Sequence, residues 1–181
     1  MNYLKNFDIV FSSLPAGLHF YKYQIDDRFF SEFNYEGLSK GLLNVSLSFE
    51  KSNKLLVLDF NIDGYLTLTC DRCLEEFDNK INITAQYVYK LVKEKSIEFY
   101  DNENLSDDNC IYIKDTDTVI NISNNIYESI ILSLPISPKH PNDENGNPLC
   151  NKEMLAKLSE YLVENENNID YWNNLNYINF N

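Results

Sequence analysis

Two stretches of alternating apolar and polar residues flank a Cys-x-x-Cys segment near the middle of the chain. Apolar residues occupy every even position from 56 to 68 except Gly64, and most odd positions from 77 to 91. Period-two alternation of this length predicts a half-buried antiparallel strand on each side. Cys70 and Cys73 then lie in the turn of a β-hairpin, where both sulfurs can face one point.

A third alternating stretch precedes this hairpin, so residues 42–92 are predicted to form a three-stranded meander. Three strands with one apolar face can hold a sheet, whereas a lone hairpin usually cannot. An aromatic strand at 18–25 and a small hairpin at 111–120 are expected to extend it. Helices at 122–134 and 152–164 are expected to pack on one face. The fold class is therefore α+β, built on an antiparallel sheet or a partly open barrel.

Capping and stop signals set the expected helix ends. Asp26 is placed to cap a short helix carrying three phenylalanines, which are expected to be core residues. Asn121 or Ser123 is expected to cap the helix that runs to residue 134. Pro135 ends that helix, since the residue before a proline avoids the helical region.

The rest of the chain gives weaker signals. A short first strand is expected at 7–11, and Gly64 suggests a bulge or a bend in the long strand. Acidic residues dominate 94–109, which predicts a solvated loop. Residues 97–99 are a candidate short strand within it. We expect a single domain over residues 1–165 and an Asn-rich tail over 166–181.

Composition narrows the class of protein. The 181 residues are 44% hydrophobic and carry a net charge of -13. This is enough apolar material for a packed core. No run of eighteen apolar residues occurs, and the N-terminus lacks an apolar signal core, so a cytoplasmic protein is expected. A free nucleic-acid binder needs a basic surface, so the net charge fits a basic protein partner better.

Cys70, Cys73, His140 and Cys150 are candidate ligands of a Cys3His zinc site. The Cys-x-x-Cys spacing is typical of zinc ligands, whereas the His-x9-Cys spacing is not. Four protein ligands leave no position for a substrate, so a bound zinc would be structural. The alternative is that the thiols carry no metal. Cys70 would then face the core, and His140 and Cys150 would be loop residues.

A thiol redox enzyme using Cys70 and Cys73 is the rival function. Such enzymes place the pair at a helix N-terminus, where the dipole lowers the thiol pKa. Here the pair lies between two antiparallel strands, and acidic neighbours oppose a thiolate. Cys110 is most simply a small core residue, and His19 a strand histidine with a satisfied ring. No glycine-rich phosphate loop or nucleophile-elbow motif is present.

Several motifs together resemble the YceD family, named for large ribosomal RNA subunit accumulation, and above all its Bacteroidetes-type members. The Cys-Asp-Arg-Cys-Leu element and the helix ending in Leu-Pro are the most specific of them. The stretches that carry the resemblance are Ile9–Phe11, Gly17–Phe20, Ile25–Phe30, Cys70–Leu74, Glu128–Pro135, His140, Gly146, Cys150 and Asn151.

The resemblance implies a non-enzymatic factor needed for normal levels of large-subunit (23S) ribosomal RNA. Its expected partners are a large-subunit RNA precursor or a basic ribosomal protein, with no membrane and no small-molecule substrate. Many family members carry further Cys pairs near the C-terminus, where this chain has only His140 and Cys150.

Arg28 and Arg72 are expected to be exposed and are candidates for contact with RNA or a partner. The alternative for both is ordinary ion pairing on an exposed surface, which contributes little to stability. A zinc-stabilised adaptor domain without any RNA role is a further alternative for the whole chain.

Overall fold

The computed structural model describes residues 3–33, 40–93 and 110–161. The acidic loop expected at 94–109 and the Asn-rich tail expected at 166–181 lie outside the described residues. The chain divides into two compact units. The first combines Met1–Thr69 with Glu76–Pro138, and the second combines Cys70–Glu75 with Lys139–Asn181. The single domain expected over 1–165 stays a prediction.

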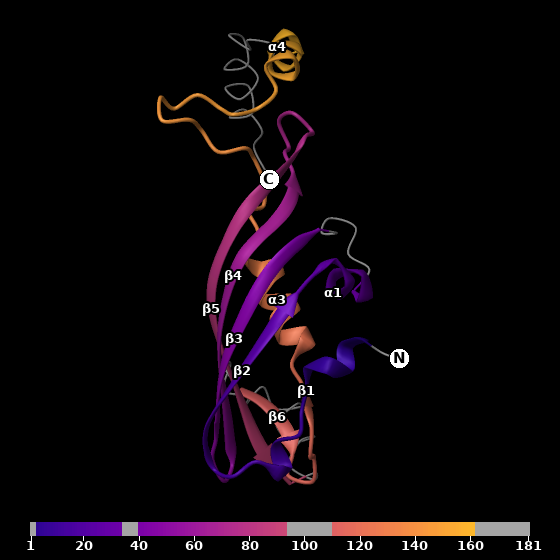
Figure 1. Cartoon of the computed structure of the whole chain (residues 1–181), viewed down its shortest axis with the longest axis vertical. Helices are drawn as coiled ribbons and strands as arrows, with labels where there is room; N and C mark the ends of the chain where they lie inside the picture. The colour runs from indigo at the N-terminus through magenta and orange to yellow at the C-terminus, as the bar shows by residue number, and fades with distance from the viewer. Residues whose placement is uncertain (1–2, 34–39, 94–109, 162–181) are drawn as a thin grey trace, which may run out of the picture. The chain divides into compact units, whose positions relative to one another are not determined.

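One five-stranded sheet forms the centre of the first unit (Figure 1). Its order is β2-β3-β4-β5-β6, with antiparallel pairing from β2 to β5 and parallel pairing of β6 with β5. The predicted meander is confirmed, and the sheet is open, so the fold is α+β without a closed barrel. The strands are β2 (Gly17–Ile25), β3 (Gly41–Lys51), β4 (Leu55–Thr69), β5 (Glu76–Val92) and β6 (Cys110–Lys114).

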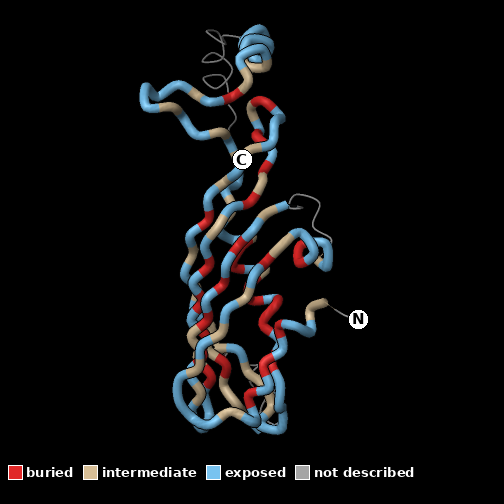
Figure 2. Tube along the Cα trace, in the orientation of Figure 1, coloured by how far each residue is buried: buried red, intermediate tan, exposed pale blue. Residues whose placement is uncertain are grey.

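The alternation of the sequence decides which face of the sheet is buried. Even positions of β4 pair with odd positions of β3 and β5, for example Phe60 with Leu47 and Ala85. Because successive side chains point to opposite faces, these residues share one face. Figure 2 shows the resulting alternation of buried and exposed residues along each strand. Helix residues complete this core, among them Phe29, Phe30, Ile122, Ile126 and Ile130.

The prediction of a hairpin at 111–120 is wrong, because its two strands do not pair with each other. β6 joins the five-stranded sheet, whereas β7 (Ile120–Asn121) pairs with β1 (Asp8–Ile9) in a separate two-stranded sheet. Alternation marks a strand but does not name its partner. The first strand is also shorter than the expected 7–11, because two 3-10 helices, Tyr3–Phe7 and Phe11–Ser13, flank it.

The helices begin and end where local chemistry predicts. The Asp26 carboxylate accepts a hydrogen bond from the Arg28 N–H at 3.1 Å and caps α1 (Asp27–Glu32). Asn121 Oδ1 accepts the first N–H of α3 (Ser123–Ser133) at 3.1 Å. α3 lies against the sheet and contacts β5 (Figure 1). The last helix, α4 (Lys152–Tyr161), belongs to the second unit rather than the unit with the sheet.

Gly64 does not form a bulge. Leu43, Gly64 and Ile81 are aligned across β3, β4 and β5, and the register runs unbroken through them. The φ angle of Gly64 is 146°, a conformation that side chains rarely adopt. A Cβ here would also collide with the backbone carbonyl oxygen of Leu42. The glycine is therefore needed for close approach of β3.

A buried polar network joins α3 to β5. Tyr89 donates its hydroxyl hydrogen to Asn125 Oδ1 at 2.7 Å, and Tyr87 donates to the Asn125 carbonyl oxygen at 3.1 Å. Ser129 also donates to that carbonyl, at 2.7 Å. The network satisfies the polar groups that helix and strand bury against each other.

Tyr89→Phe is expected to lower the free energy of unfolding by about 1–3 kcal/mol, because it leaves the buried Asn125 Oδ1 without that donor. Tyr65→Phe is the control, since Tyr65 is 44% exposed and its hydroxyl bonds no described residue; a change within about 0.5 kcal/mol is expected. Urea denaturation followed by circular dichroism measures both. Equal losses in the two variants would show that the network does not stabilise this contact.

Candidate metal centre

The turn between β4 and β5 presents the first two candidate ligands. The Cys70 N–H donates to the Glu75 carbonyl at 2.9 Å, and the Leu74 N–H donates to the Cys70 carbonyl at 2.8 Å. Leu74 closes the turn with a φ of 60°, which is uncommon for a residue other than glycine. The turn places the thiols of Cys70 and Cys73 together.

The loop that carries the other two ligands folds back on itself. Asp143 organises it, because Asp143 Oδ1 accepts N–H groups of Asn145 at 2.9 Å and Asn147 at 2.8 Å. These donors, Asn147 first among them, hold the pKa of Asp143 below its usual value. Leu149 then donates its N–H to the Pro141 carbonyl at 3.1 Å. This closure brings residues 140 and 150 together despite their separation in sequence.

Cys70, Cys73, His140 and Cys150 converge, with one ligand atom of each within 4.8 Å of all the others. The Cys70 and Cys150 sulfurs are 3.7 Å apart, and the Cys73 sulfur is 3.3 Å from His140 Nδ1. Zinc bonds of about 2.3 Å to sulfur and about 2.0 Å to nitrogen, at tetrahedral angles, imply a sulfur–sulfur separation of about 3.8 Å and a sulfur–nitrogen separation of about 3.5 Å. The two observed separations are close to these values, so the four residues could hold a metal ion.

The surroundings of Cys70 and Cys150 shift the pKa values of the two thiols in opposite directions. Burial opposes ionisation of Cys70, but N–H donors of His140, Cys73 and Arg72 outweigh it and lower its pKa to about 5. Burial and the neighbouring Cys70 and Cys73 sulfurs raise the pKa of Cys150 to about 11. The surroundings therefore favour the thiolate form of Cys70 and the neutral thiol of Cys150.

Arg72 is part of this centre, and the expectation that its side chain is exposed is wrong. The residue is half-buried, and its Nη2 donates to the His140 carbonyl at 2.8 Å. Arg28 is exposed, and its guanidinium lies 5.7 Å from the centre of the Tyr3 ring. Contact of either arginine with RNA or a partner stays a prediction.

The sequence analysis names Asn151 only as part of the family resemblance, and the structure shows what its side chain does. Its Nδ2 donates to Glu75 Oε1 at 2.7 Å, and its Oδ1 accepts the Glu153 N–H at 2.9 Å. One side chain thus caps α4 and links the residue after Cys150 to the Cys70–Glu75 turn. Its position between a ligand and a helix start was the available signal.

The remaining cysteine and histidine lie elsewhere. Cys110 is half-buried in β6, opposite Val88 of β5. The His19 ring lies within hydrogen-bonding distance of the Pro15 carbonyl, with Nε2 2.9 Å from the oxygen. Neither residue joins the group of four.

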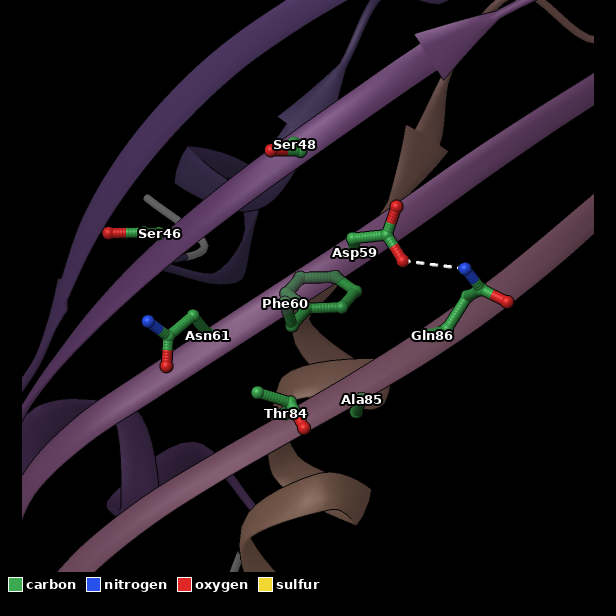
Figure 3. A pocket seen from close by; sticks show the side chains of 8 residues that line it. All are labelled: Ser46, Ser48, Asp59, Phe60, Asn61, Thr84, Ala85 and Gln86. Atoms are coloured by element: carbon green, nitrogen blue, oxygen red, sulfur yellow. Dashed lines mark hydrogen bonds between the residues drawn. The ribbon is translucent and has the colours of Figure 1, made fainter.

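A recess of about 610 Å³ opens on the solvent side of the sheet (Figure 3). Its one carboxylate, Asp59, accepts a hydrogen bond from Gln86 Nε2 at 2.7 Å. Among the described residues that line it there is no cysteine, histidine or lysine beside this carboxylate to form the paired groups of acid-base or nucleophilic catalysis. The lining residues are Ser46, Ser48, Asp59, Phe60, Asn61, Thr84, Ala85 and Gln86.

Within the described part of the chain, none of the helices has both the length and the apolar character that a membrane span requires.

Comparison with known proteins identifies the family. No curated protein and no solved structure matches the chain. The family model described as large ribosomal RNA subunit accumulation protein YceD matches residues 58–178, more than half of the chain. This range contains all four converging residues and Arg72. The chain therefore belongs to the YceD family, whose name assigns it a role in the accumulation of large-subunit ribosomal RNA.

Proposed function

We propose that this protein is a non-enzymatic factor that supports accumulation of large-subunit (23S) ribosomal RNA by binding an assembly intermediate or a basic ribosomal protein. Family membership over residues 58–178 is the observation that carries the proposal. The family name gives the process, and the choice of partner rests on charge.

The charge of the chain favours a protein contact over a contact with bare RNA. A net charge of -13 repels phosphates and attracts basic surfaces. Ribosomal proteins that neutralise RNA are basic for the same electrostatic reason. Binding such a protein before or during its assembly with RNA is a task that an acidic factor can perform.

The converging cysteines support a structural role rather than a redox role. We propose that Cys70, Cys73, His140 and Cys150 hold a structural zinc ion. Four protein ligands leave no open coordination position for a substrate. The three thiols are also at most 5% exposed. Reactive thiols need partial exposure, so burial disfavours a thiol redox enzyme even with the low pKa of Cys70.

Recovery of the tagged protein from growing cells tests the function. We expect enrichment of large-subunit RNA precursors together with early-binding basic ribosomal proteins, because the acidic chain contacts the protein component of the intermediate. Sequencing of bound RNA and mass spectrometry of bound proteins measure this. An unrelated tagged protein of similar size and negative charge controls for nonspecific attraction.

Purified components separate the two kinds of contact. Tight binding of protein-free ribosomal RNA, weakening steeply between about 50 and 200 mM salt, would contradict the protein-contact proposal. Recovery of neither large-subunit RNA nor ribosomal proteins would contradict the proposed function itself.

A further inference from the structure

Arg72 lies between Cys70 and Cys73 in the sequence, and its side chain contacts His140. Its Nη2 donates to the His140 carbonyl at 2.8 Å. Its Nε is buried and has no hydrogen-bond partner among the described residues. A buried N–H without a partner costs free energy, and a guanidinium stays charged in every accessible pH range. This cost points to a role in the centre beyond packing.

The backbone of His140 is held on two sides by the Cys70–Cys73 turn. Its carbonyl accepts from Arg72, and its N–H donates to the Cys70 sulfur at 3.4 Å. Most of the loop that follows, from Pro141 to Leu149, is exposed. These two backbone contacts join His140 to the turn that carries Cys73, whose sulfur lies 3.3 Å from the imidazole Nδ1.

The positive charge of Arg72 could also offset the net negative charge of a metal site with three thiolates. Three thiolates outweigh a divalent cation by one negative charge, and the imidazole adds none. An excess charge in a poorly solvated site is costly unless a cation lies beside it. Lys139 and Lys152, which adjoin His140 and Cys150 in sequence, are exposed, whereas Arg72 is half-buried at the ligands.

We propose that Arg72 is a positioning residue that keeps His140 as the fourth metal ligand and balances the excess charge of the three thiolates. The inference rests on the proposed metal centre and adds a role that the ligand set alone does not give. Groups that orient metal ligands from outside typically change metal affinity by roughly 10- to 100-fold when they are replaced.

Cobalt binding to the full chain tests the proposal, with Co²⁺ as the probe. Arg72→Gln is expected to weaken binding by roughly 10- to 100-fold. Its visible bands should shift from those of the unmodified protein, while the thiolate charge-transfer band keeps its intensity, because His140 leaves and the thiolates stay. Arg72→Lys is expected to recover part of the affinity, since it restores the charge without the planar fork. Arg28→Gln, which removes an exposed arginine, should match the unmodified protein.

A double-substitution cycle with His140→Ala separates positioning from general structural damage. Because the positioning role acts through His140 and only the charge balance is left without it, Arg72→Gln should cost much less affinity in the His140→Ala background than in the unmodified chain. The same cost in both backgrounds would overturn the positioning role, and an unchanged spectrum and affinity in Arg72→Gln would overturn the whole inference. Failure of the unmodified protein to bind cobalt would overturn the metal centre and the inference together.

Discussion

Cys150→Ser is expected to abolish stoichiometric zinc binding and to unfold the loop at 139–150. Structural zinc sites contribute on the order of 10 kcal/mol of apparent binding free energy at neutral pH, and that energy stabilises the fold around them. Cys150 is 5% exposed and lies 3.7 Å from the Cys70 sulfur, so its loss removes a central ligand. Metal analysis after dialysis against a weak chelator measures the zinc, and amide hydrogen exchange measures the loop.

Cys110→Ser is the matched control, because it removes a thiol that lies outside the group of four. We expect this variant to keep its zinc and the protection of its loop. In both variants the amides of β3 and β4 should stay protected, since the sheet has its own core in the first unit. Zinc retained by Cys150→Ser, or absent from the unmodified protein grown with ample zinc, would contradict the proposed site.

Gly64→Ala is expected to destabilise the sheet by about 2–5 kcal/mol. Two costs add here: a φ of 146° strains any side chain, and the new Cβ would collide with the Leu42 carbonyl oxygen of the neighbouring strand. A collision with backbone can be relieved only by moving β3 away from β4. Urea denaturation followed by far-ultraviolet circular dichroism measures the loss.

Gly17→Ala separates the two costs. Gly17 also has a positive φ, 125°, but a Cβ there would meet nothing within 4 Å. We expect a loss of about 1–2 kcal/mol from strain alone. If the two alanine variants lost the same stability, close packing of β3 on β4 would not be the reason for Gly64.

Predictions from the sequence were confirmed where apolar and polar residues alternate regularly and one face of the strand is buried. The strand that alternation predicts over 56–68 is β4, and its buried even positions follow from alternation alone. Asp26 and Pro135 mark helix ends because capping and the restricted residue before proline act within a few residues. These signals are local, so no knowledge of the tertiary structure was needed.

Reasoning failed where the partner of a segment mattered. The residues of β6 and β7 have strand character, but β6 pairs with β5 and β7 with β1. Pairing partners far apart in sequence leave no local trace. Arg72 was expected at the surface for the same reason, since its bond to His140 joins segments distant along the chain.

The meander, its buried face and the four candidate ligands could be predicted from the amino-acid sequence alone. Side-chain period, turn chemistry and the preference of soft metals for thiolate and imidazole are properties of residue types, so local patterns reveal them. That His140 and Cys150 reach the Cys70–Cys73 turn became known from the folded chain. Convergence depends on the Asp143 hydrogen bonds that close the loop, and a spacing of nine residues between ligands does not reveal that closure.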